Sequence, residues 1–340
     1  MTSTHQNGDM KAKARNSRKG RTIVVLAGII LLAGIILDGA SSYMLSYSLA
    51  CNNDRDTTLA PGFAHFRDTY PHLRPWIDSL QQCGALRDTF ITVPDGKNAG
   101  ERQHALYVQT PGANGRTALL VHGYGDSSTG MLAIASIYNK VMGYNLLLPD
   151  LHGHGLSDGQ DIQMGWIDRL DILRWTRIAE HMFGTAQTPA RIVIHGVSMG
   201  AATTMCVSGE ATPASVRCFV EDCGYTSVWD EFDHELWKRF HLPAFPLMYT
   251  TSALCHARYG WTFGEASPLR QVARCHKPML FIHGSADTFV PTAMVHPLYA
   301  AKPQPKALWI AKGSAHAQSY KDHPAEYTRR VRQFVERYIP

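Results

Sequence analysis

The sequence lacks the cysteine and glycine patterns that hold metal ions and nucleotides. Its seven cysteines form no Cys-x-x-Cys pair and no Cys/His cluster that would indicate zinc. It has no Gly-x-Gly-x-x-Gly turn, and no glycine-rich loop is followed by Lys-Ser or Lys-Thr, so no phosphate loop is indicated. Internal repeats and low-complexity tracts are also missing. We therefore expect an activity without a metal or a cofactor.

A net excess of positive charge is missing outside one short segment. The formal net charge is +5, but much of the basic excess lies in a single N-terminal run that contains no acid. The run comprises Lys11, Lys13, Arg15, Arg18, Lys19 and Arg21. Because the remainder of the chain is near neutral, we expect no nucleic-acid partner.

An uncharged, apolar run from Thr22 to Leu37 follows the basic residues directly. It is slightly short for a membrane span, but a mildly apolar stretch continues past Asp38 to Tyr47. We predict a basic cytoplasmic tail over residues 1–21 and a transmembrane signal anchor over residues 22–47, with the lipid bilayer as partner. Since positive charge stays on the cytoplasmic side, the protein would cross the cell membrane once and its main domain would be extracytoplasmic.

A cleaved N-terminus is the alternative to this anchor. Asp38 makes a poor signal-peptidase site, and Ser48-Leu49-Ala50 is better but lies far downstream. Cys51 after Ala50 suggests a lipoprotein site, yet Ser48 stands where an aliphatic residue is normally needed. We favour the uncleaved anchor. Disulfides would be permitted outside the cell, but their connectivity cannot be read from one sequence, and Cys206 is expected to be a buried filler.

The remaining chain alternates between strand and helix patterns. Strands are predicted near 88–93, 103–109, 117–121, 144–149, 191–195, 216–221, 278–282 and 306–311. Helices are predicted near 127–140, 165–183, 199–209, 292–301 and 324–338. This order predicts an α/β fold with a doubly wound, mostly parallel eight-stranded sheet over residues 88–340, whose site lies at the carboxyl ends of the strands. Residues 48–87 are expected to form a linker with a short helix, because Pro61, Pro71 and Pro75 disfavour a long element.

The segment Gly196-Val197-Ser198-Met199-Gly200 lies between a predicted buried strand and a predicted buried helix. A Gly-x-Ser-x-Gly on such a turn is typical of a nucleophile elbow, where the serine backbone is strained and the glycines avoid collisions. The pentapeptide alone also occurs in ordinary turns. The predicted strand before it and the predicted helix after it favour the interpretation as a nucleophile elbow. We predict that Ser198 is a nucleophile.

A serine hydroxyl needs a histidine base and an acid that orients it. Asp287 follows the strand at 278–282, and His316 follows the strand at 306–311. Each alone could be an ordinary loop residue, but together they follow successive strands in the order serine, aspartate, histidine. We therefore predict the catalytic triad Ser198, Asp287 and His316. Asp222, after the sixth strand, is the alternative acid.

A third loop, His122-Gly123-Tyr124-Gly125, follows the strand at 117–121. Acyl transfer builds negative charge on a carbonyl oxygen, which preorganised backbone N–H groups must stabilise. We predict that the N–H groups of Tyr124 and Met199 form this oxyanion hole. A glycine-rich turn without a ligand is the alternative.

In these features the chain resembles the α/β-hydrolase superfamily, and within it the serine aminopeptidase/monoacylglycerol-lipase-like branch. It is also similar to membrane-anchored bacterial cell-surface hydrolases. The motifs that carry the resemblance are 122–125, 150–159, 196–200, 222–227, 283–291 and His316. The resemblance implies that Asp150 braces a loop rather than serving as the triad acid. His152 stands where the family usually has arginine.

Residues 228–263 interrupt the alternation with a stretch rich in aromatic residues and methionine. We expect two short helices that form a small cap, in which Trp229, Trp237, Phe240 and Met248 bind substrate. An ordinary sheet-packing helix with a long connection is the alternative. As a cap, the segment favours an apolar acyl or aryl group, since it has no basic cluster that would meet a phosphate.

These expectations describe a serine hydrolase that cleaves carboxylic esters, esterase- or lipase-like, with a small-molecule ester or peptide substrate. A serine peptidase would use the same triad and the same two oxyanion donors, so it remains an alternative. The carboxylates that could bind the free amine of its substrate are Asp230, Glu231, Asp233 and Glu235. A noncatalytic surface-binding protein is less favoured because the triad is complete. Serine at the elbow excludes a haloalkane dehalogenase. The sequence indicates no oligomeric state.

Overall fold

The computed structural model describes residues 4–51 and 58–340, and side chains from residue 21 onward within those ranges. The side chains of most of the predicted basic tail, and residues 52–57 of the predicted linker, lie outside the described part. An eight-stranded sheet has the order β1-β2-β4-β3-β5-β6-β7-β8. Its strands are β1 Leu86–Thr92, β2 Arg102–Val108, β3 Arg116–Val121, β4 Asn145–Pro149, β5 Arg191–Val197, β6 Val216–Asp222, β7 Met279–Gly284 and β8 Lys306–Ala311.

The sheet is antiparallel only at one edge, where β2 pairs with β1 and with β4. From β4 onward every pairing is parallel. The residues of β4 and β7 are buried throughout, as expected for strands covered on both faces. Alternation along β3 divides the core in two, because Leu119 and Val121 pack on one face while Ala118 and Leu120 pack on the other.

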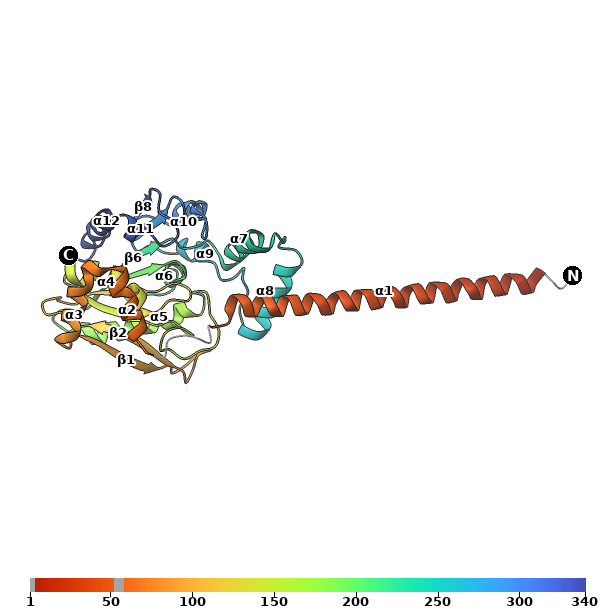
Figure 1. Cartoon of the computed structure of the whole chain (residues 1–340), viewed down its shortest axis with the longest axis horizontal. Coiled ribbons are helices and arrows are strands. Elements are labelled where there is room, and N and C mark those ends of the chain that lie inside the picture. Colours follow the sequence, from red (N-terminus) through yellow and green to blue (C-terminus); the bar gives the residue numbers. More distant parts are fainter. Residues whose placement is uncertain (1–3, 52–57) are drawn as a thin grey trace.

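Helices cover both faces of this sheet (Figure 1). The first core contains residues of α5 Asp168–Phe183, α6 Met199–Ser208, α9 Pro268–Val272 and α10 Val295–Ala301. The second contains residues of α2 Ala60–Thr69, α3 Arg74–Gln82, α4 Leu132–Ser136 and α12 Pro324–Glu336. Short turns complete the body: η1 Pro71–Leu73, η2 Ser128–Met131, η3 Ile137–Val141, η4 Thr292–Met294 and α11 Ser319–Asp322. The predicted doubly wound α/β-hydrolase fold is confirmed.

The segment between residues 58 and 82 is more regular than the linker expected from its prolines. Pro61 and Pro75 occupy the first turns of α2 and α3, and Pro71 the first turn of η1. A proline is tolerated there because the N–H it lacks would have no partner in the helix. Phe63, Phe66 and Ile77 are buried in the second core. This segment is therefore part of the folded body.

Two helices of the same length interrupt the alternation where a cap was expected: α7 Val228–Phe240 and α8 Leu247–Tyr259. The side chain of Ser227 caps α7 by accepting a hydrogen bond from the N–H of Asp230, at 3.0 Å. The helix ends at His241, which takes a left-handed conformation with φ 53°. Figure 1 shows α7 and α8 on the side of the body from which α1 projects.

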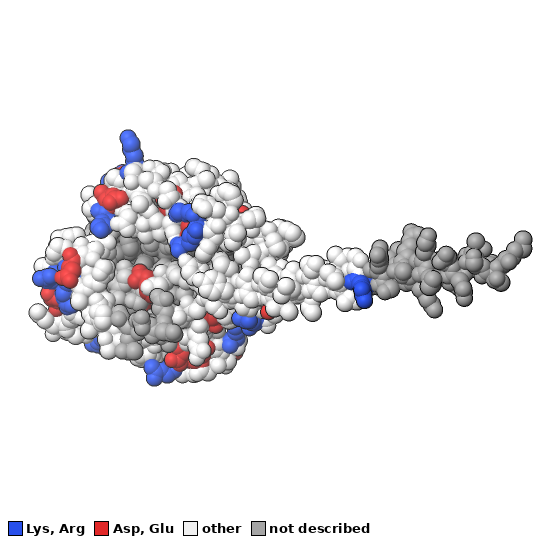
Figure 2. Space-filling model, turned by 45° about the vertical axis from the view of Figure 1, so that its right-hand side comes forward, with Lys and Arg blue, Asp and Glu red and all other residues white. Residues whose placement is uncertain are grey.

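One helix, α1 Thr4–Leu49, begins in the predicted basic tail and ends against the body (Figure 1). Among the described residues, only its segment Arg21–Leu49 is long and apolar enough to cross a membrane. The most apolar stretch of that segment has a mean hydropathy of 2.6, and none of it is buried. A signal sequence has the same length and composition. Figure 2 shows the described shaft of α1 as a largely uncharged surface.

The end of α1 differs from its shaft. Leu45 and Leu49 are fully buried in the first core, and the carbonyl of Leu49 accepts a hydrogen bond from the N–H of Ile162 at 2.7 Å. Ser41 is also buried. The last turns of α1 therefore belong to the folded body, and no linker separates them from the apolar shaft.

Candidate active site

The nucleophile elbow has the backbone that its sequence predicted. Ser198 lies between β5 and α6 with φ 58° and ψ −121°, a strained conformation for a residue with a side chain. A Cβ at Gly196 would lie 2.0 Å from the carbonyl oxygen of Gly200, and one at Gly200 would lie 2.0 Å from that of Val121. Only glycine fits at either position, so the packing fixes Ser198 at the carboxyl end of β5.

Ser198, His316 and Asp287 form a continuous hydrogen-bonded chain. Ser198 Oγ lies 2.8 Å from His316 Nε2, and His316 Nδ1 lies 2.7 Å from Asp287 Oδ2. The loops after β7 and β8 supply the acid and the histidine, so the parallel strands bring them to one edge of the sheet. The His316 side chain is 21% exposed, whereas that of Asp287 is fully buried. This arrangement can remove a proton from the serine hydroxyl.

The Asp287 carboxylate is held in its charged form. Its Oδ1 accepts hydrogen bonds from the N–H groups of Phe289 and Val290, both at 3.0 Å. Burial raises the pKa of Asp287, but hydrogen bonds from His283 and His316 outweigh it and lower the pKa to about 2. An ionised acid at neutral pH is what a serine–histidine pair requires.

Asp222, the alternative acid, has different partners. Its Oδ1 accepts a hydrogen bond from Ser319 Oγ at 3.3 Å, and its main-chain oxygen accepts one from the N–H of Ser198 at 2.8 Å. Burial raises the pKa of its carboxyl to about 6. Asp222 thus supports the elbow through its backbone, while Asp287 is the acid bonded to His316.

One group among the described side chains could be mistaken for a metal site. The ligand atoms of Cys223, Asp287 and His316 all lie within 4.8 Å of one another. Burial raises the pKa of the Cys223 thiol well above its ordinary value, so the thiolate that a metal prefers is disfavoured. Asp287 and His316 are already hydrogen-bonded to each other. The group therefore fits a proton-transfer chain better than a metal site.

The predicted oxyanion loop lies beside the nucleophile. A Cβ at Gly123 would lie 3.4 Å from Ser198 Cβ, which places the peptide before Tyr124 next to the reacting hydroxyl. Met199 is buried at the start of α6, where unpaired N–H groups point out of the helix. The Tyr124 hydroxyl donates to the carbonyl of Ser48 at 3.1 Å. Met199 thus follows Ser198 in the chain and Tyr124 follows the glycine that packs against Ser198, while the oxyanion hole itself stays a prediction.

Asp150 joins neighbouring loops, which is in line with the bracing role that the resemblance implied. Its carboxylate accepts hydrogen bonds from the N–H groups of Ser128 at 2.6 Å and Leu156 at 2.9 Å, and lies 2.7 Å from His104 Nδ1. Burial raises its pKa, but the hydrogen bond and charge of His104 outweigh it, and the pKa is lowered. Asp150 therefore joins loops and lies outside the reacting chain.

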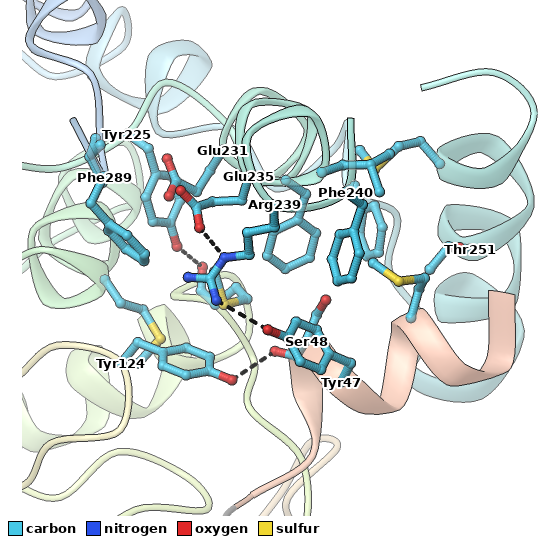
Figure 3. A pocket seen from close by; sticks show the side chains of 18 of the residues that line it. Tyr47, Ser48, Tyr124, Tyr225, Glu231, Glu235, Arg239, Phe240, Thr251 and Phe289 are labelled. Carbon is cyan, nitrogen blue, oxygen red and sulfur yellow. Dashed lines mark hydrogen bonds and ion pairs between the residues drawn. The ribbon is translucent and has the colours of Figure 1, made fainter. Parts of the chain in front are cut away.

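Ser198 and Met199 line a cavity of about 310 Å³. Figure 3 labels several of its other lining residues. Of the four predicted cap residues, Phe240 and Met248 line it, but Trp229 and Trp237 do not. The lining positions of α7 recur every three or four residues, at Glu231, Phe232, Glu235, Leu236, Arg239 and Phe240. Trp237 falls outside this stripe and is exposed, while Trp229 packs edge to face with Tyr249 of α8. Neither tryptophan is a cavity residue.

Two glutamates face the cavity from α7 (Figure 3). Glu235 pairs with Arg239, whereas neither carboxylate oxygen of Glu231 has a hydrogen-bond partner among the described residues. Glu231 is only 4% exposed. Burial, then the charges of Glu235 and Asp287, raise its pKa to about 8. Among mostly apolar walls, the cavity therefore holds one ion pair, Glu235–Arg239, and one buried acid, Glu231, without a hydrogen-bond partner among the described residues.

The end of α1 also lines the cavity, through Met44, Tyr47 and Ser48, and the sequence did not lead us to expect this. The available signal was the absence of proline or a charged spacer after Asp38, with Leu45 and Leu49 spaced four residues apart. That spacing favours a helix face that packs on a protein, but it does not say which surface the face meets.

Comparisons with known proteins show what the chain is similar to. The model of the prolyl oligopeptidase family matches residues 138–340. The uncharacterized protein YqkD of Bacillus subtilis is 27% identical over 230 residues, which are 68% of this chain and 74% of that protein. Among solved structures, the esterase Pf2001 of Pyrococcus furiosus superposes with a TM-score of 0.59 at 22% identity, covering 77% of this chain and 94% of that one.

A second solved structure shares only part of its length with this chain. The acylaminoacyl peptidase of Pyrococcus horikoshii has a TM-score of 0.54 and 18% identity, over 74% of this chain and 40% of that one. Both structures show the fold, and the family match contains Ser198, Asp287 and His316. Because the match spans more than half of the sequence, the chain belongs to the prolyl oligopeptidase family and is a serine hydrolase of the α/β-hydrolase fold.

Proposed function

We propose that the protein is a membrane-anchored serine esterase that cleaves carboxylic esters through an acyl-enzyme. The observation that carries the proposal is the chain of hydrogen bonds from Ser198 through His316 to Asp287, at 2.8 and 2.7 Å, below an apolar cavity. A serine activated in this way attacks carbonyl carbon, and the cavity offers room for the acyl group.

In the proposed reaction, Ser198 Oγ attacks the ester carbonyl while His316 Nε2 takes its proton. Asp287 holds the tautomer of His316 and stabilises the imidazolium. The N–H groups of Tyr124 and Met199 stabilise the oxyanion. The carbon–oxygen bond to the alcohol breaks, and His316 returns the proton to that alcohol. Water then repeats the sequence on the acyl-enzyme, releasing the carboxylic acid and restoring Ser198.

The cavity favours an ester with an apolar acyl chain. Its walls include Met164, Leu236, Phe240, Leu247 and Met248. Removing apolar surface from water is worth about 0.8 kcal/mol per CH₂ group, so each added carbon that fits should improve binding. We expect turnover to rise with acyl length until the cavity is filled.

The protein is proposed to keep its N-terminus as an anchor, with residues 1–21 cytoplasmic, residues 22–47 in the membrane and the hydrolase body of residues 88–340 outside. The burial of Leu45 and Leu49 supports this choice over a cleaved signal. Cleavage near Ala50 would remove both side chains from the core and expose the surface they cover.

A peptidase that recognises a free amine is the second candidate, and a specific observation favours it. Glu231 and Glu235 line the cavity above the serine, and Glu231 lacks a hydrogen-bond partner within the described residues. An ammonium group would satisfy it and would lower its pKa. The family name also points to peptide cleavage.

Purified full-length protein should be tested against p-nitrophenyl esters of increasing acyl length and against aminoacyl p-nitroanilides. We expect ester turnover, and labelling by a fluorophosphonate probe that Ser198→Ala abolishes. Faster turnover of anilides with a free amine, lost in Glu231→Gln, would favour the peptidase. Labelling that persists in Ser198→Ala would contradict both candidates.

A further inference from the structure

The end of α1 forms part of the cavity wall. Tyr47 Oη accepts a hydrogen bond from Arg239 Nη1 at 3.1 Å, and its ring meets Phe240 edge to face at 5.9 Å. The next carbonyl, of Ser48, accepts the hydrogen bond from Tyr124. Figure 3 shows Tyr47 and Ser48 at the end of this helix, facing Arg239 and Tyr124. The helix that leaves the body thus touches both the cap and the oxyanion loop.

The same helix is fixed against α8 just before it reaches the cavity. Ser41 Oγ lies 2.7 Å from Thr250 Oγ1, and Arg258 donates to Ser42 Oγ at 3.2 Å. Leu45, one turn after Ser41, is fully buried. The position of the cap along α1 is therefore set to within about one helical turn.

Helix length then places the cap relative to the membrane. A hydrocarbon layer of about 30 Å takes up about 20 helical residues. Counted from Arg21, the first described basic side chain, a span of that length ends near Ser41. Because Ser41 contacts Thr250, the outer boundary of the layer falls at the level of α8.

Exposed apolar side chains gather at this level. We name them the cap rim: Tyr43 of α1 with Trp237, Leu242, Phe245 and Tyr249 of the cap, all exposed, Phe245 to 72%. No aspartate or glutamate occurs from His241 to Gly260. Figure 2 shows the surface of the body next to α1 as largely uncharged. Tyrosine and tryptophan beside a span are typical of the membrane interface.

We propose that the cap rim rests in the interface of the bilayer that α1 crosses, and that the cavity takes the acyl chain of a membrane-resident ester directly from that leaflet. The proposal rests on the esterase function and on the anchoring of α1. Tyr43 of the rim stacks on Tyr47 with 6.2 Å between ring centroids, and Tyr47 lines the cavity together with Phe240, so the rim adjoins the cavity. An acyl chain could pass from lipid to Ser198 without crossing water.

The test uses the full chain reconstituted in vesicles of phosphatidylcholine and phosphatidylglycerol. One substrate, 4-methylumbelliferyl palmitate, is dissolved in the vesicles, and the other, p-nitrophenyl acetate, stays in water. In the double variant Leu242→Glu/Phe245→Glu, we expect palmitate turnover to fall at least about tenfold and acetate turnover to stay within about twofold. Val141→Glu, at an exposed apolar residue of η3, is the matched control and should change neither.

An equal effect on both substrates, or no effect on either, would overturn the proposal. A second measurement does not depend on activity. Brominated phosphatidylcholine should quench the tryptophan fluorescence of the wild type, and Trp237→Phe should lose a clear part of that quenching. Undiminished quenching in Trp237→Phe would also overturn the proposal. If the wild type turns over neither ester, the esterase function fails, and the quenching still decides whether the rim meets lipid.

Discussion

His283 Nε2 lies 3.4 Å from Asp287 Oδ2, the oxygen that also binds His316. The same His283 nitrogen lies 3.0 Å from the carbonyl of Val290, so it is held between two acceptors. Burial lowers the pKa of His283, but Asp287 and Glu221 outweigh it and raise the pKa. One carboxylate oxygen is therefore shared by two histidines, and both of them stabilise the ionised form of Asp287.

The first prediction concerns this acid. Asp287→Asn should keep the fold but favour the wrong tautomer of His316, with a loss in kcat on the order of 10⁴ by analogy with serine proteases. Asp222→Asn is the comparison and should cost far less, since its carboxylate contacts Ser319 instead. Ester turnover by both purified variants measures the difference. A severe Asp222→Asn loss beside a mild Asp287→Asn loss would reassign the acid.

The second prediction concerns pH and Glu231. The pKa of this buried carboxyl is about 8 in the folded protein and about 4.3 when unfolded. The folded state therefore holds the extra proton between these values, and the free energy of unfolding falls as pH rises from about 4.5 to about 8. Glu231→Gln does not titrate, so its Tm relative to wild type should increase from pH 5 to pH 9. Thermal unfolding in detergent measures both proteins.

The sign of that change is the critical result. A Tm difference that stays constant from pH 5 to pH 9, or that shifts against the variant as pH rises, would show that Glu231 is ionised without strain. Asp233→Asn, at an exposed residue of the same helix, serves as the control for the substitution.

The third prediction concerns the elbow. Gly200→Ala should prevent folding or cost at least about 3 kcal/mol, because the new methyl group would meet the backbone of Val121 at 2.0 Å. Gly264→Ala is the control, since nothing lies within 4 Å of a Cβ there. Expression yield and denaturant unfolding compare the two. An active, stable Gly200→Ala protein would contradict the described packing.

The fourth prediction concerns the cavity. Met248→Trp should fill part of the space of about 310 Å³ and exclude long acyl chains. Turnover of p-nitrophenyl octanoate should fall at least about tenfold relative to the butyrate, whereas Trp229→Phe, outside the cavity, should leave the chain-length profile unchanged. If Trp229→Phe changed the chain-length profile as much as Met248→Trp does, the acyl group would bind elsewhere.

The fifth prediction concerns the N-terminus. Mature protein should retain residues 1–49, stay in the membrane at high salt, and present its body to protease added outside intact cells. Mass spectrometry of the N-terminus would distinguish this from a soluble form that begins near Cys51 or from a lipid-modified Cys51. Leu45→Ala should cost about 2–5 kcal/mol of stability, as buried leucines do, while Ser46→Ala on the exposed side should cost little.

Strand positions were predictable because each strand is a short apolar run bounded by turn residues. Every predicted strand range overlaps an observed one, and the loops after β5, β7 and β8 hold Ser198, Asp287 and His316 as the chain order indicated. Parallel strands carry their following loops to the same edge. A local pattern therefore sufficed to place groups that are far apart in the sequence.

Features that depend on packing between distant elements were not predictable in the same way. Composition alone marked Trp229 and Trp237 as cavity residues, but the rotation of α7 turns Glu231 and Arg239 inward instead. Prolines indicated a break in residues 58–82, although each lies where a helix tolerates it. The contact of α1 with the cap depends on which face meets α8, and no short motif encodes that.

The direct passage of α1 into the body limits where the enzyme can act. A flexible tether of n residues would let a catalytic body wander by roughly 5–6 Å × √n from its anchor. With α1 as the proposed membrane anchor, the buried Leu45 and the Ser41–Thr250 contact would hold the body at a constant height and orientation relative to the bilayer. Esters a few nanometres above the membrane would stay beyond its reach, whatever their chemistry.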